Sequence, residues 1–286
     1  MLENIFRRST YPSLGWEHKF QSTVWRLMPS HPSFIVGECR DVNLKNTTFF
    51  CVDIFTGRIQ WTNLHLEERW WVGIESVVNK FIVFHKYLRP DMPQHQGIII
   101  VDLISGVTVW SNDHYKYYGI DDNCIYVQDE ALIENQLLKL DIKTGKVIEE
   151  ITYEAFNHKP ATQSPTSYIT ADIINLEEIS IPVVKKYLSN KKGDKLIDPT
   201  EILVSGNLYV IGINYKSSQQ PQQGSVSEDI LIMNKGGKVL YQECINTGGS
   251  VPVLTKFFLK QNIIIYIKDK NRLKAIKITA DNENIN

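Results

Sequence analysis

A ten-residue motif recurs along the chain, and it limits the possible folds more than any other feature. Residues 52–61 read VDIFTGRIQW and residues 101–110 read VDLISGVTVW. Residues 140–149 read LDIKTGKVIE, which keeps the spacing but ends in Glu, and a looser copy at 233–241 lacks the Asp. The positions that define the copies are Asp53, Gly57 and Trp61; Asp102, Gly106 and Trp110; Asp141 and Gly145; and Gly237 and Tyr241.

Each part of the motif has a role in a β-hairpin. An apolar strand leads to the Asp, whose carboxylate can accept hydrogen bonds from the backbone N–H groups that follow it. The Gly suits a position with positive φ, which other residues adopt only at a cost. After it, apolar residues alternate as in a half-buried strand. The motif therefore predicts a hairpin with a fixed turn chemistry.

Each copy closes a unit of about 40 residues with four expected strands. Repeated units of this length and content are typical of a β-propeller, in which no blade buries both of its faces alone. The sequence therefore predicts a single all-β domain, a propeller of about five or alternatively six four-stranded blades. The expected blades are residues 22–64, 68–112, 115–151, 180–245 and 250–280, with 152–180 as an irregular connection.

The last expected blade lacks an outer strand, and residues 14–20, LGWEHKF, have no hairpin partner nearby. We expect this N-terminal strand to complete the last blade and to close the ring, with Trp16 in the role of Trp61. Closure would remove exposed strand edges, which otherwise promote aggregation.

The motif resembles the quinoprotein-type (PQQ-like, or WD-like) β-propeller repeat, whose pattern runs apolar-Asp-x-x-Thr-Gly-x-x-x-Trp. The resemblance covers residues 20–150 well and 200–280 loosely. It implies that the turn and the Trp pack blade against blade and do not bind a quinone. The chain as a whole resembles an uncharacterised bacterial family with degenerate repeats of this kind.

Composition and motifs argue against several classes of protein. A formal net charge of -1 over 286 residues gives no electrostatic case for nucleic acid or an anionic membrane. The first 20 residues lack the apolar core of a signal peptide, and the four cysteines include no CxxC pair. We expect a cytoplasmic monomer without cofactor or metal, whose partner is an unidentified protein or peptide.

Three groups of residues are candidates for a site. Glu75 and Asp121 each follow a Gly-Ile step, so inner-strand carboxylates at Glu75, Asp121 and Asp122 could act in catalysis, although IDDNC also reads as a plain turn. A second group, His85, His95, Asp113 and His114, lacks the spacing of a zinc motif.

The third group is aromatic and basic. Residues expected on inner or adjoining strands could line a binding surface, although at least half should be core. The expected binding residues are Trp25, Arg26, Trp71, Tyr117 and Tyr118.

These observations favour a non-catalytic protein- or ligand-binding scaffold. The alternative is a hydrolase or lyase that acts on a sugar-like substrate through the inner-strand carboxylates. A third possibility is a subunit whose ring is completed by a partner. No pattern in the sequence identifies the ligand.

Overall fold

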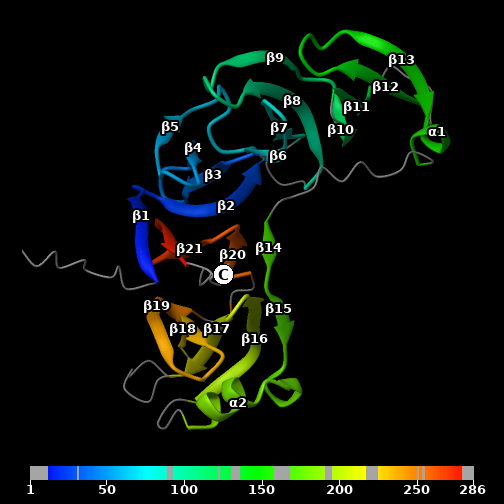
Figure 1. Ribbon diagram of the computed structural model, residues 1–286. Helices are drawn as coiled ribbons and strands as arrows, with labels where there is room; N and C mark the ends of the chain where they lie inside the picture. The colour runs from blue at the N-terminus through cyan, green and yellow to red at the C-terminus, as the bar shows by residue number, and fades with distance from the viewer. Residues whose placement is uncertain are drawn as a thin grey trace, which may run out of the picture. The chain divides into compact units, whose positions relative to one another are not determined.

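The protein is all-β. The computed structural model describes residues 12–30, 32–88, 93–121, 123–129, 136–157, 168–190, 195–216, 225–249, 251–252 and 255–278. Their strands form five antiparallel sheets (Figure 1). In these ranges no helix has the length and apolar character needed to cross a membrane. The chain divides into two compact units, a central unit, residues 22–167, and a terminal unit, residues 1–21 with 168–286.

The central unit contains three four-stranded sheets whose strands follow one another in chain order, as in propeller blades. The first contains β2 (Thr23–Ser30), β3 (Phe34–Asp41), β4 (Asn46–Asp53) and β5 (Ile59–Leu64). The second contains β6 (Val72–Val78), β7 (Phe81–Tyr87), β8 (His95–Asp102) and β9 (Thr108–Asn112). The third contains β10 (Lys116–Ile120), β11 (Cys124–Gln128), β12 (Gln136–Asp141) and β13 (Val147–Thr152), followed by α1 (Tyr153–Asn157). These sheets coincide with the expected units at 22–64, 68–112 and 115–151.

The terminal unit contains two five-stranded sheets. One has the order β1-β22-β21-β20-β14 and contains β1 (Ser13–Lys19), β22 (Arg272–Lys277), β21 (Ile263–Lys268), β20 (Phe257–Lys260) and β14 (Ile169–Thr170). The other runs β15 (Asp172–Ile174), β16 (Lys195–Ser205), β17 (Leu208–Lys216), β18 (Val226–Asn234) and β19 (Val239–Gly249). A 3-10 turn (Leu176–Glu178) and α2 (Pro182–Ser189) lie between β15 and β16 in the chain.

The N-terminal strand has the partner that the sequence predicted. β1 pairs antiparallel with β22, in a register from Ser13 opposite Lys277 to Lys19 opposite Arg272. The described residues of the expected irregular connection, 152–180, include two strands: β14 adds to one sheet of the terminal unit and β15 to the other. Two short strands there were not predicted, since two or three residues are too few to show a periodic pattern.

The turns use the chemistry that the motif predicts. Asp53 Oδ1 accepts the N–H groups of Phe55 and Thr56 and the Thr56 hydroxyl, at 2.8 to 3.1 Å. Asp102 and Asp141 make the same contacts with Ser105 and Thr144. The glycines of the three turns have φ of +72°, +70° and +67°. The hairpin prediction is confirmed.

The motif tryptophans join neighbouring sheets of the central unit. Trp61 Nε1 donates to the carbonyl oxygen of Leu103 in the next turn at 2.9 Å, and Trp110 Nε1 donates to that of Ile142 at 2.7 Å. A Cβ built on Gly106 would lie 3.2 Å from the Trp61 ring, and one on Gly145 would lie 2.9 Å from the Trp110 ring. Glycine is therefore required at this position for two reasons: its φ is positive, and the indole leaves no room for a side chain. The predicted packing of Trp between blades is confirmed for these two copies.

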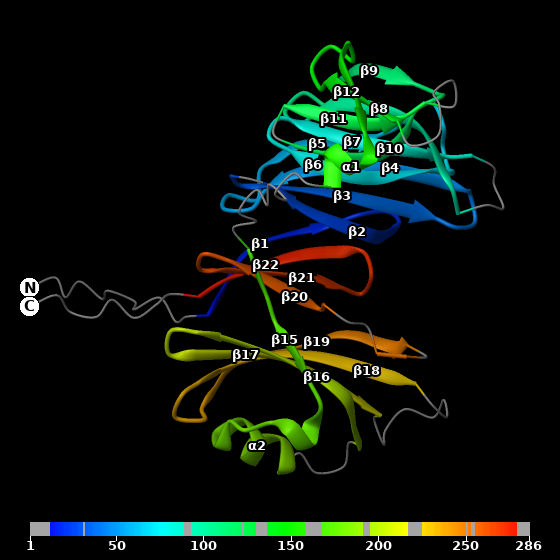
Figure 2. The same ribbon diagram turned by 90° about the vertical axis from the view of Figure 1, so that its right-hand side faces the viewer.

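The third and fourth copies of the motif depart from this pattern. In the third copy Glu149 stands where Trp would be, and α1 instead places Phe156 against Gly119 and Tyr126 of the inner strands. In the fourth copy Gly237 meets Val183 of α2. Helix α2 covers a face of the β15–β19 sheet (Figure 2), where Val184 and Leu188 are buried. In the sheets of these two copies the Trp–Gly contact is missing, and a helix packs on the sheet instead, α1 in the central unit and α2 in the terminal unit.

The fourth copy also corrects the sequence alignment. Asn234 takes the place of the Asp, since its N–H donates to the carbonyl of Lys238 and its Oδ1 accepts the Lys238 N–H at 2.9 Å. The turn is one residue shorter, with Gly237 bonded to the carbonyl of Asn234 three residues before it. An alignment on Gly237 therefore missed the Asn.

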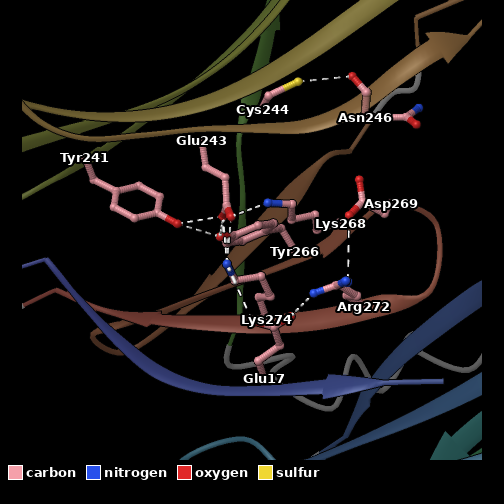
Figure 3. A network of polar contacts seen from close by, with 10 residues as sticks. All are labelled: Glu17, Tyr241, Glu243, Cys244, Asn246, Tyr266, Lys268, Asp269, Arg272 and Lys274. Atoms are coloured by element: carbon pink, nitrogen blue, oxygen red, sulfur yellow. Dashed lines mark hydrogen bonds and ion pairs between the residues drawn. The ribbon is translucent and has the colours of Figure 1, made fainter.

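Tyr241, the Trp replacement of this copy, joins the two sheets of the terminal unit through polar contacts (Figure 3). Its hydroxyl lies 2.9 Å from the Tyr266 hydroxyl, and both tyrosines donate to Glu243. Lys268 and Lys274 each donate to Glu243 Oε1 at 2.7 Å. Burial alone would raise the pKa of Glu243, but these hydrogen bonds outweigh it and lower the pKa to about 2. Glu243 is therefore ionised at neutral pH, and its carboxylate accepts hydrogen bonds from four side chains that belong to two sheets.

Candidate functional site

The first two sheets of the central unit enclose a cavity of about 320 Å³. Its lining comes from β2, β3, β6 and β7 and from the segments that adjoin them. The lining residues are Trp25, Arg26, Glu38, Arg40, Val42, Trp70, Gly73, His85 and Tyr87. Trp25 is 62% exposed, whereas Glu38 and His85 are almost completely buried. The cavity therefore joins an exposed aromatic residue to buried ionisable groups.

Local backbone features position the aromatic residues of this cavity. Trp25 is a bulged residue of β2, because the pairing with β3 shifts between Val24 and Arg26. Before β6, Glu68 Oε1 accepts the N–H groups of Trp70 and Trp71, both at 2.9 Å. The Trp71 ring then makes edge contacts with Trp70 and with Tyr87, at centroid distances of 6.3 and 5.8 Å.

An ion pair forms one wall of the cavity. Arg40 Nε donates to Glu38 Oε1 at 2.6 Å, and its two terminal nitrogens donate to the carbonyls of Trp70 and Val72 at 2.9 and 2.7 Å. The guanidinium also lies over the Trp70 ring, 5.1 Å from its centroid. Glu38 Oε2 accepts the N–H of Ile74. The charges of Arg40 and Glu38 are thus satisfied by each other and by backbone groups. The ion pair therefore shapes the cavity and joins the two sheets.

Glu75, His85 and His95 meet at this sheet from three consecutive strands. Glu75 is the bulged residue of β6, His85 lies on β7 and His95 lies on β8. Glu75 Oε2 is 2.8 Å from His85 Nδ1 and 3.0 Å from His95 Nδ1. The two imidazole rings are stacked, with centroids 3.5 Å apart and planes 6° apart. One carboxylate oxygen thus contacts both histidines.

The electrostatics of this group follow from its burial. Burial would raise the pKa of Glu75, but the contacts with His85 and His95 outweigh it and lower that pKa. Burial and then the charge of His85 lower the pKa of His95, although Glu75 opposes the shift. An anionic carboxylate beside a neutral imidazole is the form in which both groups act as ligands for a metal ion.

The proposed carboxylate pair is not supported. The bulged residues of β2, β6 and β10 are Trp25, Glu75 and Tyr118, so Glu75 corresponds to Tyr118 and the equivalence with Asp121 is wrong. Asp121 lies just after β10 and accepts the N–H groups of its turn and the Tyr126 hydroxyl at 2.6 Å. The turn interpretation of Asp121 is thus correct. Asp122 lies outside the described residues.

The expected aromatic and basic binding residues lie in different places. Trp25 and Arg26 line the cavity, and Trp71 packs behind it. Burial raises the pKa of Tyr117 to about 12, and the negative charge of Glu75 adds to this effect. Tyr117 therefore lies close enough to Glu75 to feel its charge. Tyr118 stacks on Tyr153 of α1 at a centroid distance of 4.9 Å.

Sequence reasoning missed several residues of this site. Glu38 and Arg40 are charged residues two apart on a strand, in FIVGECRD, and this is a signal for a buried ion pair. Of the histidine candidates, His85 and His95 do come together. Asp113 instead pairs with Lys86 at 2.7 Å, and His114 is exposed. The strands β7 and β8 bring the two histidines together, so no short spacing could reveal them.

Comparison with known proteins adds a family match but no function. The solved structures similar to this chain include a europium-containing methanol dehydrogenase, at 12% identity over 91% of this chain and 50% of that chain, with a TM-score of 0.28. They also include Hsv2 of Kluyveromyces marxianus, at 8% identity over 90% and 77% with a TM-score of 0.30. An acylaminoacyl peptidase of Pyrococcus horikoshii matches at 10% identity over 86% and 36%, also with a TM-score of 0.30. Likenesses this weak transfer no activity to this chain.

No curated protein matches this chain. Residues 30–110, which hold most of the cavity and all of Glu75, His85 and His95, match a family described as a domain of unknown function, DUF4905.

Proposed function

We propose that this chain is a non-catalytic binding module, a propeller of five blades, that holds a peptide segment of a partner protein at the β2–β3 and β6–β7 cavity. The observation that carries this proposal is the cavity itself, in which an indole 62% exposed adjoins a concave site with Arg26 and Tyr87 in its lining. Trp, Tyr and Arg dominate the energetics of protein interfaces. A volume of about 320 Å³ suits one large side chain of the partner.

The polar wall supports binding over catalysis. Arg40 and Glu38 bond to each other and to the backbone, so they offer a fixed surface without a base aligned on a nucleophile. A rigid, preformed wall lowers the entropy that a partner loses on binding. The five sheets found among the described residues support five blades over six, and the pairing of β1 with β22 supports closure by the N-terminal strand.

A display selection without counter-selection tests this proposal. A random peptide library is selected on the full chain, and the affinities of the selected peptides for wild-type protein and for Trp25→Ala are measured by fluorescence polarisation. We expect Trp25→Ala to weaken binding by about 30-fold or more, since truncation of a hot-spot side chain costs at least about 2 kcal/mol. Val107→Ala is the control, because Val107 is also 62% exposed but is absent from the cavity lining.

Circular dichroism must show that both variants are folded. Peptides that bind wild-type protein and Trp25→Ala equally, or a selection that yields no binder, would overturn the proposed site.

A further inference from the structure

Three side chains beside the cavity have the donor atoms of a metal site. Glu75, His85 and His95 each offer one ligand atom, and these atoms all lie within 4.8 Å of one another. They come from three adjacent strands of one sheet, which is a rigid support. Two imidazole nitrogens and one carboxylate oxygen are a donor set that first-row transition ions accept, with bond lengths of about 2.0 to 2.2 Å for Zn²⁺.

The state of His85 is a second and independent observation. Its side chain is 2% exposed, and neither ring nitrogen has a hydrogen-bond partner among the described residues. Glu75 Oε2 is close to Nδ1 but does not lie in line for a hydrogen bond. Leaving a buried polar group unsatisfied is costly, and native structures avoid it. Gly73 leaves room on the other side, since a Cβ there would lie 3.1 Å from Nε2.

We propose that Glu75, His85 and His95 bind one divalent first-row transition ion of the Zn²⁺ class through one oxygen and two nitrogens. Three protein ligands leave at least one coordination position for water or for a group of the bound partner. The site adjoins the proposed peptide cavity and shares His85 with it, but ion binding does not depend on the peptide.

The geometry indicates which ligand moves when the ion binds. The rings are now parallel, so their lone pairs do not converge on one point. His85 is held in the core with a side chain 2% exposed, whereas the His95 side chain is 37% exposed, so we expect His95 to be the ligand that turns. Glu75 Oε2 is already within 3.0 Å of both Nδ1 atoms, so it needs only to withdraw from between them. A small rotation of His95 and Glu75 therefore completes the site.

Metal titration of the full chain tests the proposal. Protein without a histidine tag is treated with a chelator, dialysed, and titrated with Zn²⁺ by calorimetry and with Co²⁺ by visible absorption. We expect one ion per chain and a Co²⁺ spectrum without sulfur-to-metal charge transfer, which would separate this site from adventitious binding at the exposed Cys244. His95→Ala should weaken Zn²⁺ binding by about 100-fold or more, because it removes a direct ligand, and loss of a mere supporting contact already costs 10- to 100-fold.

Matched variants make each outcome decisive. His114→Ala removes an exposed histidine outside the group and should leave the affinity unchanged. Glu75→Gln keeps the shape of the side chain but removes its charge, and it should also weaken binding. Wild-type protein that binds neither ion at micromolar concentration, or His95→Ala that binds as wild type does, would overturn the proposal. Trp25→Ala should retain Zn²⁺ affinity, so the metal site and the peptide site can fail separately.

Discussion

The contact between Gly145 and Trp110 allows a quantitative test of how the sheets are joined. Gly145→Ala places a Cβ 2.9 Å from the indole at a residue whose φ is +67°. A left-handed backbone alone costs an L-residue about 1 to 2 kcal/mol. Overpacking a contact costs a further 1 to 3 kcal/mol, roughly. We therefore expect Gly145→Ala to lower the free energy of unfolding of the central unit by about 2 to 5 kcal/mol.

A double-mutant cycle separates the two costs. In a Trp110→Ala background the crowding is gone, so Gly145→Ala should cost only the backbone term, and the coupling between the sites should equal the crowding cost, about 1 to 3 kcal/mol. Gly206→Ala is a matched control, because Gly206 has φ of +53° and a Cβ added there would meet no atom within 4 Å among the described residues beyond its chain neighbours. It should cost the backbone term alone.

Urea unfolding followed by tryptophan fluorescence measures the cycle. Four tryptophans, Trp25, Trp61, Trp70 and Trp71, still report on the central unit when Trp110 is replaced. Gly206 lies in the terminal unit, so its variant is followed by far-ultraviolet circular dichroism. If Gly145→Ala costs the same with and without Trp110, the indole does not pack on the turn and the assigned role of the motif is wrong.

Three further predictions concern other contacts. The folded-state pKa of Glu243 is about 2 against an ordinary 4.5, so its ionised form stabilises the fold above pH 4.5 and that contribution is lost as the pH falls towards 2. Glu243→Gln should reduce the loss of unfolding free energy over this pH window by about 1 to 2 kcal/mol after screening by water, as measured by urea unfolding. An unchanged pH dependence would contradict this. Glu201 and Lys256 form an ion pair of 3.1 Å with both side chains at most 1% exposed. Glu201→Leu alone should cost about 3 to 5 kcal/mol and the double variant with Lys256→Met less, as measured by chemical unfolding; additive costs would argue against coupling. Tyr118→Ala should bind the peptides selected on the full chain with an affinity within about twofold of wild type, because the Tyr118 ring packs on α1. A larger loss would place Tyr118 at the binding surface.

The parts of the fold that were predictable are those encoded locally. The spacing from Asp53 to Gly57 to Trp61 specifies an Asx turn, a left-handed glycine and a strand, and all three depend on neighbours within ten residues. The contact of the indole with the next sheet was implied by the resemblance to the quinoprotein-type repeat, and both copies that keep the Trp make it.

The parts that were not predictable depend on irregular or distant contacts. A bulge adds one residue to a strand, so the Gly-Ile steps of β6 and β10 gave a register that the pairing does not follow. The group at Glu75 depends on that bulge and on a β7–β8 pairing that joins Tyr87 to His95. Asn234 was hidden because its turn is a residue shorter.

The pairing of β1 with β22 determines the order in which the chain can fold during synthesis. Contacts such as that of Arg272 with Glu17 at 3.1 Å join residues 255 apart. The described strands of the central unit are complete once about residue 152 has been made, whereas β1 must wait for its partner until residues 272–277 leave the ribosome. Loss of β22 would therefore leave β1 without its partner and β21 paired only with β20, and both strands would present an open edge to other nascent chains.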